Sequence, residues 1–126
     1  MPPATLASVS RPDELELALE QHPSGAAVLR VIGEVDLATV SEMEHALAAS
    51  SSSLLVVVDL TECTFLDSSA LHALLSAAAN AGDANAFAIV AQEGGVRRLL
   101  DIAGAAPSVP IHATVAEAVE AHARNG

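Results

Sequence analysis

The 126-residue chain carries five Lys and Arg against sixteen Asp and Glu, and its formal net charge at pH 7 is −11. This charge disfavours binding to nucleic-acid phosphates and to anionic membranes, and two aromatic residues, Phe65 and Phe87, are too few for a base-stacking surface. The length suits one domain with a single hydrophobic core over residues 1–126, with fraying expected at residues 1–5 and 124–126.

The first quarter of the chain predicts a β-hairpin. Residues 6–9 could contribute an edge strand after a proline-containing lead-in. Residues 13–21 fit either a short acidic helix or a strand, and the strand is favoured because the leucines are spaced by two. A turn at 22–25 leads to an apolar strand at 26–32, so we expect the two strands to pair in antiparallel fashion.

The middle of the chain predicts two amphipathic helices around a buried strand. Residues 37–49 form the first helix, and the β-branched run at 54–60 is typical of a strand buried on both faces at the centre of a sheet. Residues 61–67 are expected to form a turn before a second helix at 68–81, which ends at Gly82. The predicted buried stripes are Leu37, Val40, Met43, Ala46 and Leu47 in the first helix, and Leu71, Leu74, Leu75 and Ala78 in the second.

The last third alternates strand and helix. A buried strand is expected at 86–91, a helix at 96–103, a short segment around Ile111, and a last helix at 115–124, for which Thr114 is a good N-cap. Such alternation predicts parallel pairings with helices packed against the sheet. The fold class is therefore α/β, with a mixed sheet of four to five strands and about four helices.

The tripeptide Asp67-Ser68-Ser69 lies where the second helix is expected to begin. The first turn of a helix leaves backbone N–H groups free, and Asp67 is well placed to cap them. Both serine hydroxyls are then near an exposed helix N-terminus. Taken alone, the tripeptide predicts only a capped helix, because Asp and Ser are generally favoured at such positions.

A series of motifs carries more information than the tripeptide. Gly33-Glu34-Val35-Asp36 is followed by DLTECTFLDSSAL from Asp59 to Leu71, then by GGVRRLLDIAG and a final VAEAV helix. This order resembles the STAS domain of bacterial anti-sigma factor antagonists over roughly residues 5–123. Its most specific part is the spacing from Asp59 through the Asp-Ser-Ser turn to Leu71.

The resemblance implies a sheet with the helices packed mainly on one face. It also implies a regulatory binding protein and not an enzyme. In that family an anti-sigma factor with GHKL-type serine kinase activity phosphorylates the serine that follows the aspartate, which is Ser68 here, with Ser69 as a secondary candidate. The unphosphorylated form would bind the anti-sigma factor and free a sigma factor, and a serine phosphatase would reverse the modification. The residues implied at the partner interface are Asp36, Asp67, Ser68, Ser69 and Ala70, where Ala70 replaces the glycine usual in the family.

Two other functions stay open. The chain could be a constitutive STAS-like structural subunit of an ABC lipid-transport complex, with the same turn docked on an ATPase. A nucleotide-binding domain would rest only on the Gly94-Gly95 turn, which no P-loop lysine follows.

No metal, cofactor or catalytic site is predicted. The five histidines lack paired-ligand spacing, and Ser68 and His72 are four residues apart without a G-x-S-x-G elbow. The single cysteine, Cys63, excludes an intramolecular disulfide and suits a reducing compartment. Neither a signal peptide nor an apolar run of about 20 residues is visible. We therefore expect a cytoplasmic protein that does not insert into membranes and binds a basic or neutral protein.

Overall fold

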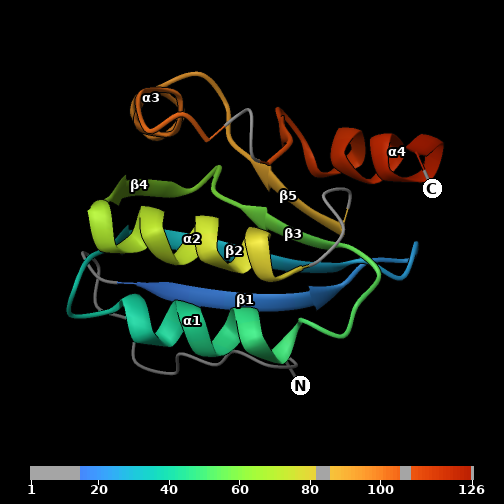
Figure 1. The fold of residues 1–126 in the computed structure, drawn as a ribbon, viewed down its shortest axis with the longest axis horizontal. Coiled ribbons are helices and arrows are strands. Elements are labelled where there is room, and N and C mark those ends of the chain that lie inside the picture. The colour runs from blue at the N-terminus through green and yellow to red at the C-terminus, as the bar shows by residue number, and fades with distance from the viewer. Residues whose placement is uncertain (1–14, 82–85, 106–108, 126) are drawn as a thin grey trace.

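The computed structural model describes residues 15–81, 86–105 and 109–125, which form four helices and a six-stranded mixed sheet (Figure 1). The edge strand expected near residues 6–9 and the stop expected at Gly82 lie outside the described residues. In chain order the elements are β1 (Glu16–Gln21), β2 (Ala27–Val35), α1 (Val40–Ala49), β3 (Val56–Asp59), β4 (Cys63–Leu66), α2 (Ser68–Asn80), β5 (Phe87–Val90), α3 (Gly95–Ile102), β6 (Ile111–His112) and α4 (Val115–Asn125).

The strand order is β1-β2-β3-β5-β6, with β3 at the centre as expected. β1 pairs with β2 in antiparallel fashion, which confirms the hairpin, and Leu17 lies opposite Val31 with both side chains buried. The pairings of β2 with β3, β3 with β5 and β5 with β6 are all parallel. The predicted alternation of strand and helix in the second half is confirmed.

The prediction of a turn over residues 61–67 was wrong, because these residues contain the short strand β4. β3 pairs only with the first part of β2, up to Arg30, and β4 then pairs with the end of β2, where Gly33 is opposite Cys63 and Val35 is opposite Leu66. The nine-residue β2 thus has backbone groups beyond β3 that need partners, and β4 supplies them. The sheet accordingly has six strands rather than four or five.

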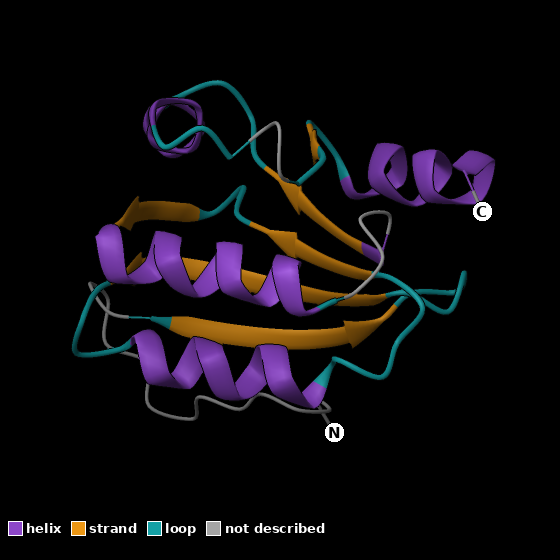
Figure 2. Ribbon diagram, viewed as in Figure 1, coloured by secondary structure: helices purple, strands orange, loops and turns teal. Residues whose placement is uncertain are grey.

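The two faces of the sheet pack against different helices. Successive strand residues point to opposite faces, so Val58 joins the larger core and Val57 the smaller one. The larger core includes buried residues of α1, α2 and α3, and Figure 2 shows α1 and α2 side by side in front of the strands. Ala118 of α4 packs in the smaller core, so three helices share one face and α4 covers the other.

The predicted helix stripes are largely confirmed, with one error. In α2, Leu74 is fully buried and Leu71, Leu75 and Ala78 pack against the core. Leu37, however, is 78% exposed, because α1 begins only at Val40. The last helix follows a cap as expected, since the backbone N–H of Glu117 donates to the Thr114 hydroxyl at 3.0 Å.

We expect Leu74→Ala to lower the free energy of unfolding by about 2–5 kcal/mol, because it removes a fully buried side chain and leaves a cavity. Leu54→Ala is the matched control, because Leu54 is 81% exposed, and its effect should stay within about 0.5 kcal/mol. Urea denaturation followed by circular dichroism measures both. Equal effects of the two substitutions would contradict the described packing.

Candidate functional site

The candidate site lies where β2 and β4 end side by side. Val35 is opposite Leu66 in the parallel pairing, and the backbone N–H of Asp67 donates to the Val35 carbonyl at 3.1 Å. The chain then enters α1 after β2 and α2 after β4, so both helices start at the same end of the molecule, at the left of Figure 1. This register places Asp36 and Asp67 on neighbouring strand ends.

Asp67 is the N-cap of α2. Its Oδ1 atom accepts hydrogen bonds from the Ser69 hydroxyl at 2.6 Å and from the Ala70 backbone N–H at 3.0 Å. The hydrogen bond from the Ser69 hydroxyl is the largest cause that lowers the pKa of Asp67 below its ordinary value of 3.8, and the one from the Ala70 N–H adds to it. The backbone N–H groups of Leu37 and Ser69 also face this carboxyl group and lower its pKa. Asp67 is therefore ionised at neutral pH.

Asp36 organises the turn that leads into α1. Its Oδ1 atom accepts hydrogen bonds from the backbone N–H groups of Ala38 at 3.0 Å and Thr39 at 3.2 Å, and its carbonyl oxygen accepts one from the Val40 N–H at 2.8 Å. The carboxylate is thus engaged within its own turn. Asp36 directly follows Val35, the residue of β2 that pairs with Leu66, and the partner contact that the resemblance implies for Asp36 stays a prediction.

The two serines differ in what their hydroxyl groups can do. Ser68 is exposed, and within the described part of the chain its hydroxyl has no hydrogen-bond partner. Ser69 is partly buried, and its hydroxyl donates to Asp67. A modifying enzyme would therefore meet a free hydroxyl at Ser68 and an occupied one at Ser69.

Ala70 lies in the core and not on the surface. Its residue exposure is 0%, and it belongs to the same buried cluster as Leu74. The sequence-based hypothesis placed Ala70 at the partner interface, where its methyl group could crowd a partner. Because the methyl group is buried, it is not available for such a contact.

Sequence reasoning missed two apolar side chains at this end of the molecule. Leu37 is 78% exposed in the turn between β2 and α1, and Phe65 is 44% exposed on β4. Leu37 was assigned to a helix stripe, and Phe65 to a turn. No local pattern in the sequence distinguished Phe65, which is exposed, from Phe87, which is buried.

The remaining candidates do not come together into a second site. No group of three or more His, Cys, Asp or Glu residues that could hold a metal ion occurs among residues 15–81, 86–105 and 109–125. His72 lies with its Nε2 atom 3.5 Å from the Ser76 hydroxyl, and it has no hydrogen bond with Ser68. Burial raises the pKa of the Cys63 thiol, which suits the expected small buried residue. Gly94 has a φ of 147° and Gly95 begins α3, which is a loop-to-helix turn.

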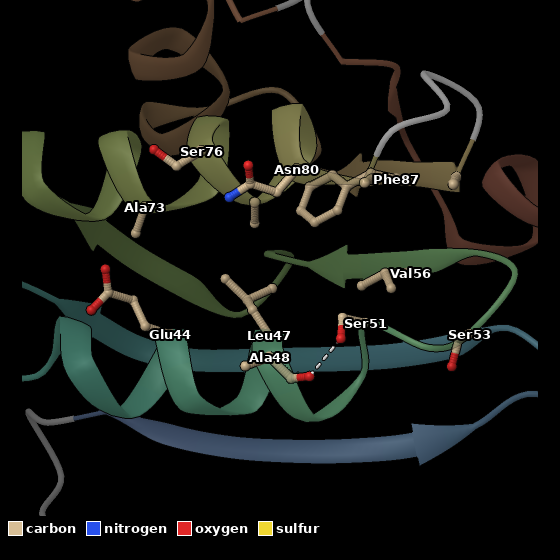
Figure 3. Close-up of a pocket in the computed structure, with 13 residues that line it drawn as sticks. Glu44, Leu47, Ala48, Ser51, Ser53, Val56, Ala73, Ser76, Asn80 and Phe87 are labelled. Atoms are coloured by element: carbon tan, nitrogen blue, oxygen red, sulfur yellow. Dashed lines mark hydrogen bonds between the residues drawn. The ribbon is translucent and has the colours of Figure 1, made fainter.

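A cavity of about 390 Å³ lies between α1 and α2, away from the Asp67 turn (Figure 3). Leu47, Val56 and Phe87 line its apolar side, and Asn80 comes from the last turn of α2. The cavity is therefore at the opposite end of α2 from Ser68. No helix in the described part of the chain is both long enough and apolar enough to cross a membrane.

Comparison with known proteins identifies the family. The family model of the STAS domain matches residues 17–118. The chain belongs to the STAS domain family. The anti-sigma-F factor antagonist RsfB of Mycobacterium tuberculosis is 28% identical over 113 residues, which cover 88% of this chain and 92% of that protein.

Solved structures agree with the assignment to the STAS family. The crystal structure of an anti-sigma factor antagonist from Mycobacterium paratuberculosis has a TM-score of 0.83 and 29% identity, over 91% of this chain and 99% of that one. The anti-sigma factor antagonist SpoIIAA in its unphosphorylated form has a TM-score of 0.69 at 19% identity, over 87% of this chain and 97% of that one. At that identity, SpoIIAA supports the shared fold alone.

Asp67→Asn tests the contribution of the charged cap to the stability of this STAS domain. Asn can still accept the hydrogen bonds, so the variant loses the charge and keeps the cap. Because the pKa of Asp67 is lowered, the ionised cap stabilises the fold above pH 3.8, and this contribution disappears as the pH falls through the lowered pKa. We expect wild type to be more stable than the variant at pH 7, and the difference to shrink at acidic pH.

The urea midpoints of wild type and Asp67→Asn, measured from pH 7 down to acidic pH, test this expectation. Glu93→Gln is the control, because Glu93 is an exposed loop residue. A difference between wild type and Asp67→Asn that stays constant with pH would show that the charge of Asp67 does not stabilise the fold.

Proposed function

We propose that this protein is an anti-sigma factor antagonist, and that phosphorylation of Ser68 switches its binding off. The observation that carries the proposal is the free, exposed hydroxyl of Ser68 at the start of α2, next to a Ser69 hydroxyl that is occupied by Asp67. Relatives that are named as anti-sigma factor antagonists, and that match nearly the whole chain, support the same function.

The proposed partner is an anti-sigma factor with GHKL-type serine kinase activity. The unphosphorylated protein binds it and thereby frees a sigma factor in the cytoplasm. The kinase transfers the γ-phosphoryl group of ATP to the Ser68 Oγ atom, so that an O–P bond forms at serine, the bond to the β-phosphate oxygen breaks, and ADP and a proton are released. A serine phosphatase hydrolyses the phosphoserine and restores binding.

Local electrostatics explain how one phosphate could abolish binding without unfolding the protein. A phosphoserine carries about −1.5 to −2 charges at neutral pH, and the N-terminal end of a helix dipole favours such a charge. The fold should therefore tolerate it. In an interface, however, the phosphate would be desolvated beside the ionised Asp67, on a chain with a net charge of −11. Burying an unpaired charge is costly, and about 2.7 kcal/mol is enough to weaken binding 100-fold.

The switch predicts opposite behaviour for two Ser68 variants. Ser68→Ala should bind the anti-sigma factor constitutively, because it cannot be phosphorylated, and Ser68→Asp should bind about 100-fold more weakly. Ser69→Ala should still be phosphorylated. Isothermal titration calorimetry with a purified GHKL-type anti-sigma factor measures affinity, and phosphopeptide mass spectrometry identifies the modified serine.

Ser52→Asp is a matched charge control, because Ser52 is exposed in the turn after α1, at the other end of that helix from the site, and its hydroxyl has no hydrogen-bond partner in the described part of the chain. Equal affinity of Ser68→Ala and Ser68→Asp would refute the switch, as would a phosphate found only on Ser69. Co-purification with an ATPase and a transporter permease, and with no kinase, would instead favour the structural subunit of a lipid-transport complex.

Ala70→Gly separates folding from partner binding at the same turn. The loss of a buried methyl group and of helix propensity should lower the free energy of unfolding by about 1–2 kcal/mol. Affinity for the anti-sigma factor should be unchanged, because the methyl group does not reach the surface. Ala116→Gly, at an exposed position of α4, is the control for propensity alone. A changed affinity of Ala70→Gly at unchanged stability would contradict the buried position.

A further inference from the structure

Four large apolar side chains of the described residues are exposed, namely Leu37, Leu54, Phe65 and Ile102. Isolated exposed apolar residues are ordinary on protein surfaces, so exposure alone indicates nothing. Their placement is informative, because two of the four belong to the strand ends that carry the Asp67 turn. Leu37 follows β2 by two residues, and Phe65 precedes Asp67 by two.

Leu37 lies close to the Asp67 turn, because the Asp67 backbone N–H donates to the carbonyl of Val35, two residues before Leu37. The Leu37 N–H group is near enough to the Asp67 carboxyl group to contribute to its lowered pKa. The Asp36 carboxylate accepts hydrogen bonds from the N–H groups that follow Leu37, at 3.0 Å from Ala38 and 3.2 Å from Thr39. An exposed leucine in a turn that is ordered in this way is presented in a defined position, which lowers the entropic cost of using it in an interface.

Phe65 is held on the other strand of the pair. It lies on β4 opposite Glu34 of β2, and β4 also contacts α3. The second aromatic residue of the chain, Phe87, is only 3% exposed in the core, so Phe65 is the one aromatic side chain at the surface. Aromatic residues in partly enclosed positions are enriched at protein interfaces and among the residues that dominate binding energy.

We propose that Leu37 and Phe65 are the apolar anchors with which this protein binds the anti-sigma factor, Leu37 from the turn after β2 and Phe65 from β4, on the sheet face opposite to that of Leu66. The inference rests on the proposed function and adds the residues that supply the affinity. The partner surface would carry apolar pockets for the two side chains, with cationic groups around them to match Glu34 and Asp67.

The two anchors also account for the effect of the phosphate. Apolar contacts exclude water from the surface between them, and a group that must enter such a surface loses its hydration. The Ser68 hydroxyl is small and neutral, so it enters at little cost. A phosphate at the same atom is charged, and the residue before it in the turn is the ionised Asp67. Phosphorylation at Ser68 would thus oppose binding through Leu37 and Phe65.

The negative charge of the chain favours the anti-sigma factor, rather than a second copy of this chain, as the protein that binds Leu37 and Phe65. Two copies would each bring a net charge of −11, together with Glu34 and Asp67 at the contact. Like charges facing one another oppose association, whereas a basic partner would be attracted and steered.

The test compares four truncations of exposed apolar residues. Leu37→Ala and Phe65→Ala should each weaken binding to a purified GHKL-type anti-sigma factor by about ten-fold or more. Leu54→Ala and Ile102→Ala are the matched controls, because these residues are 81% and 76% exposed and lie outside the turn, and binding should change less than about two-fold. Calorimetry with an ATP analogue that cannot transfer its phosphoryl group keeps phosphorylation from contributing to the result.

Each outcome bears on a separate proposal. Wild-type affinity of both anchor variants, with the wild type still bound and phosphorylated at Ser68, would overturn the anchors and leave the switch intact. Failure of the wild type to bind would overturn both proposals. Weakened binding of the two anchor variants, with unchanged urea midpoints, would support the anchors. If sedimentation showed that the wild type is a dimer and that Leu37→Ala and Phe65→Ala are monomers, this surface would be assigned to self-association instead.

Discussion

The Asp67 carboxylate lies between two segments that are far apart in the chain, the start of α2 and the turn after β2. It caps α2 through the Ala70 N–H and holds the Ser69 hydroxyl, and the N–H of Leu37 from the turn after β2 faces it. The position of Asp67 is set in turn by the backbone bond to Val35. If the Asp67 side-chain oxygen were removed, the start of α2 would lose its cap and the Ser69 hydroxyl would lose its acceptor.

The three small residues that follow Asp67 therefore have different roles. Ser69 and Ala70 serve the fold, one through its hydroxyl and the other through a buried methyl group. The Ser68 hydroxyl is exposed and makes no hydrogen bond in the described part of the chain, so it stays available for modification. A charge added at Ser68 therefore disturbs few internal contacts. Such a position suits reversible modification, because the protein can change its surface repeatedly without refolding.

Local pattern was enough to predict most of the elements. The spacing of Met43 and Leu47 indicated α1, and the β-branched run through Val57 indicated the central strand, because both signals lie within a few consecutive residues. β4 could not be found this way. It exists because β2 continues beyond β3 and leaves backbone groups to be paired, which is a property of two strands far apart in the chain. Leu37 was misassigned for a similar reason, since its helical spacing was correct and its helix starts later.

The site was predicted at the level of the turn and not of its atoms. The sequence indicated a capped helix at Asp67, and the capping bond is present. Which serine would be free depended on which hydroxyl reaches the Asp67 carboxylate, and adjacent identical residues carry no information on that. The burial of Ala70 depends on how α2 packs against the sheet, and a local sequence pattern does not show that packing.

Cys63 lies four residues before Asp67, on the strand that carries Phe65, and its thiol is buried with a raised pKa. The thiolate is the form that peroxides and disulfides attack, and a buried neutral thiol supplies little of it. The only sulfhydryl of the chain therefore has little thiolate to offer to oxidants, although it lies four residues from Asp67. Direct oxidation of Cys63 would require this part of β4 to open first, so the burial of one side chain separates the chemistry of the thiol from the surface of the Asp67 turn.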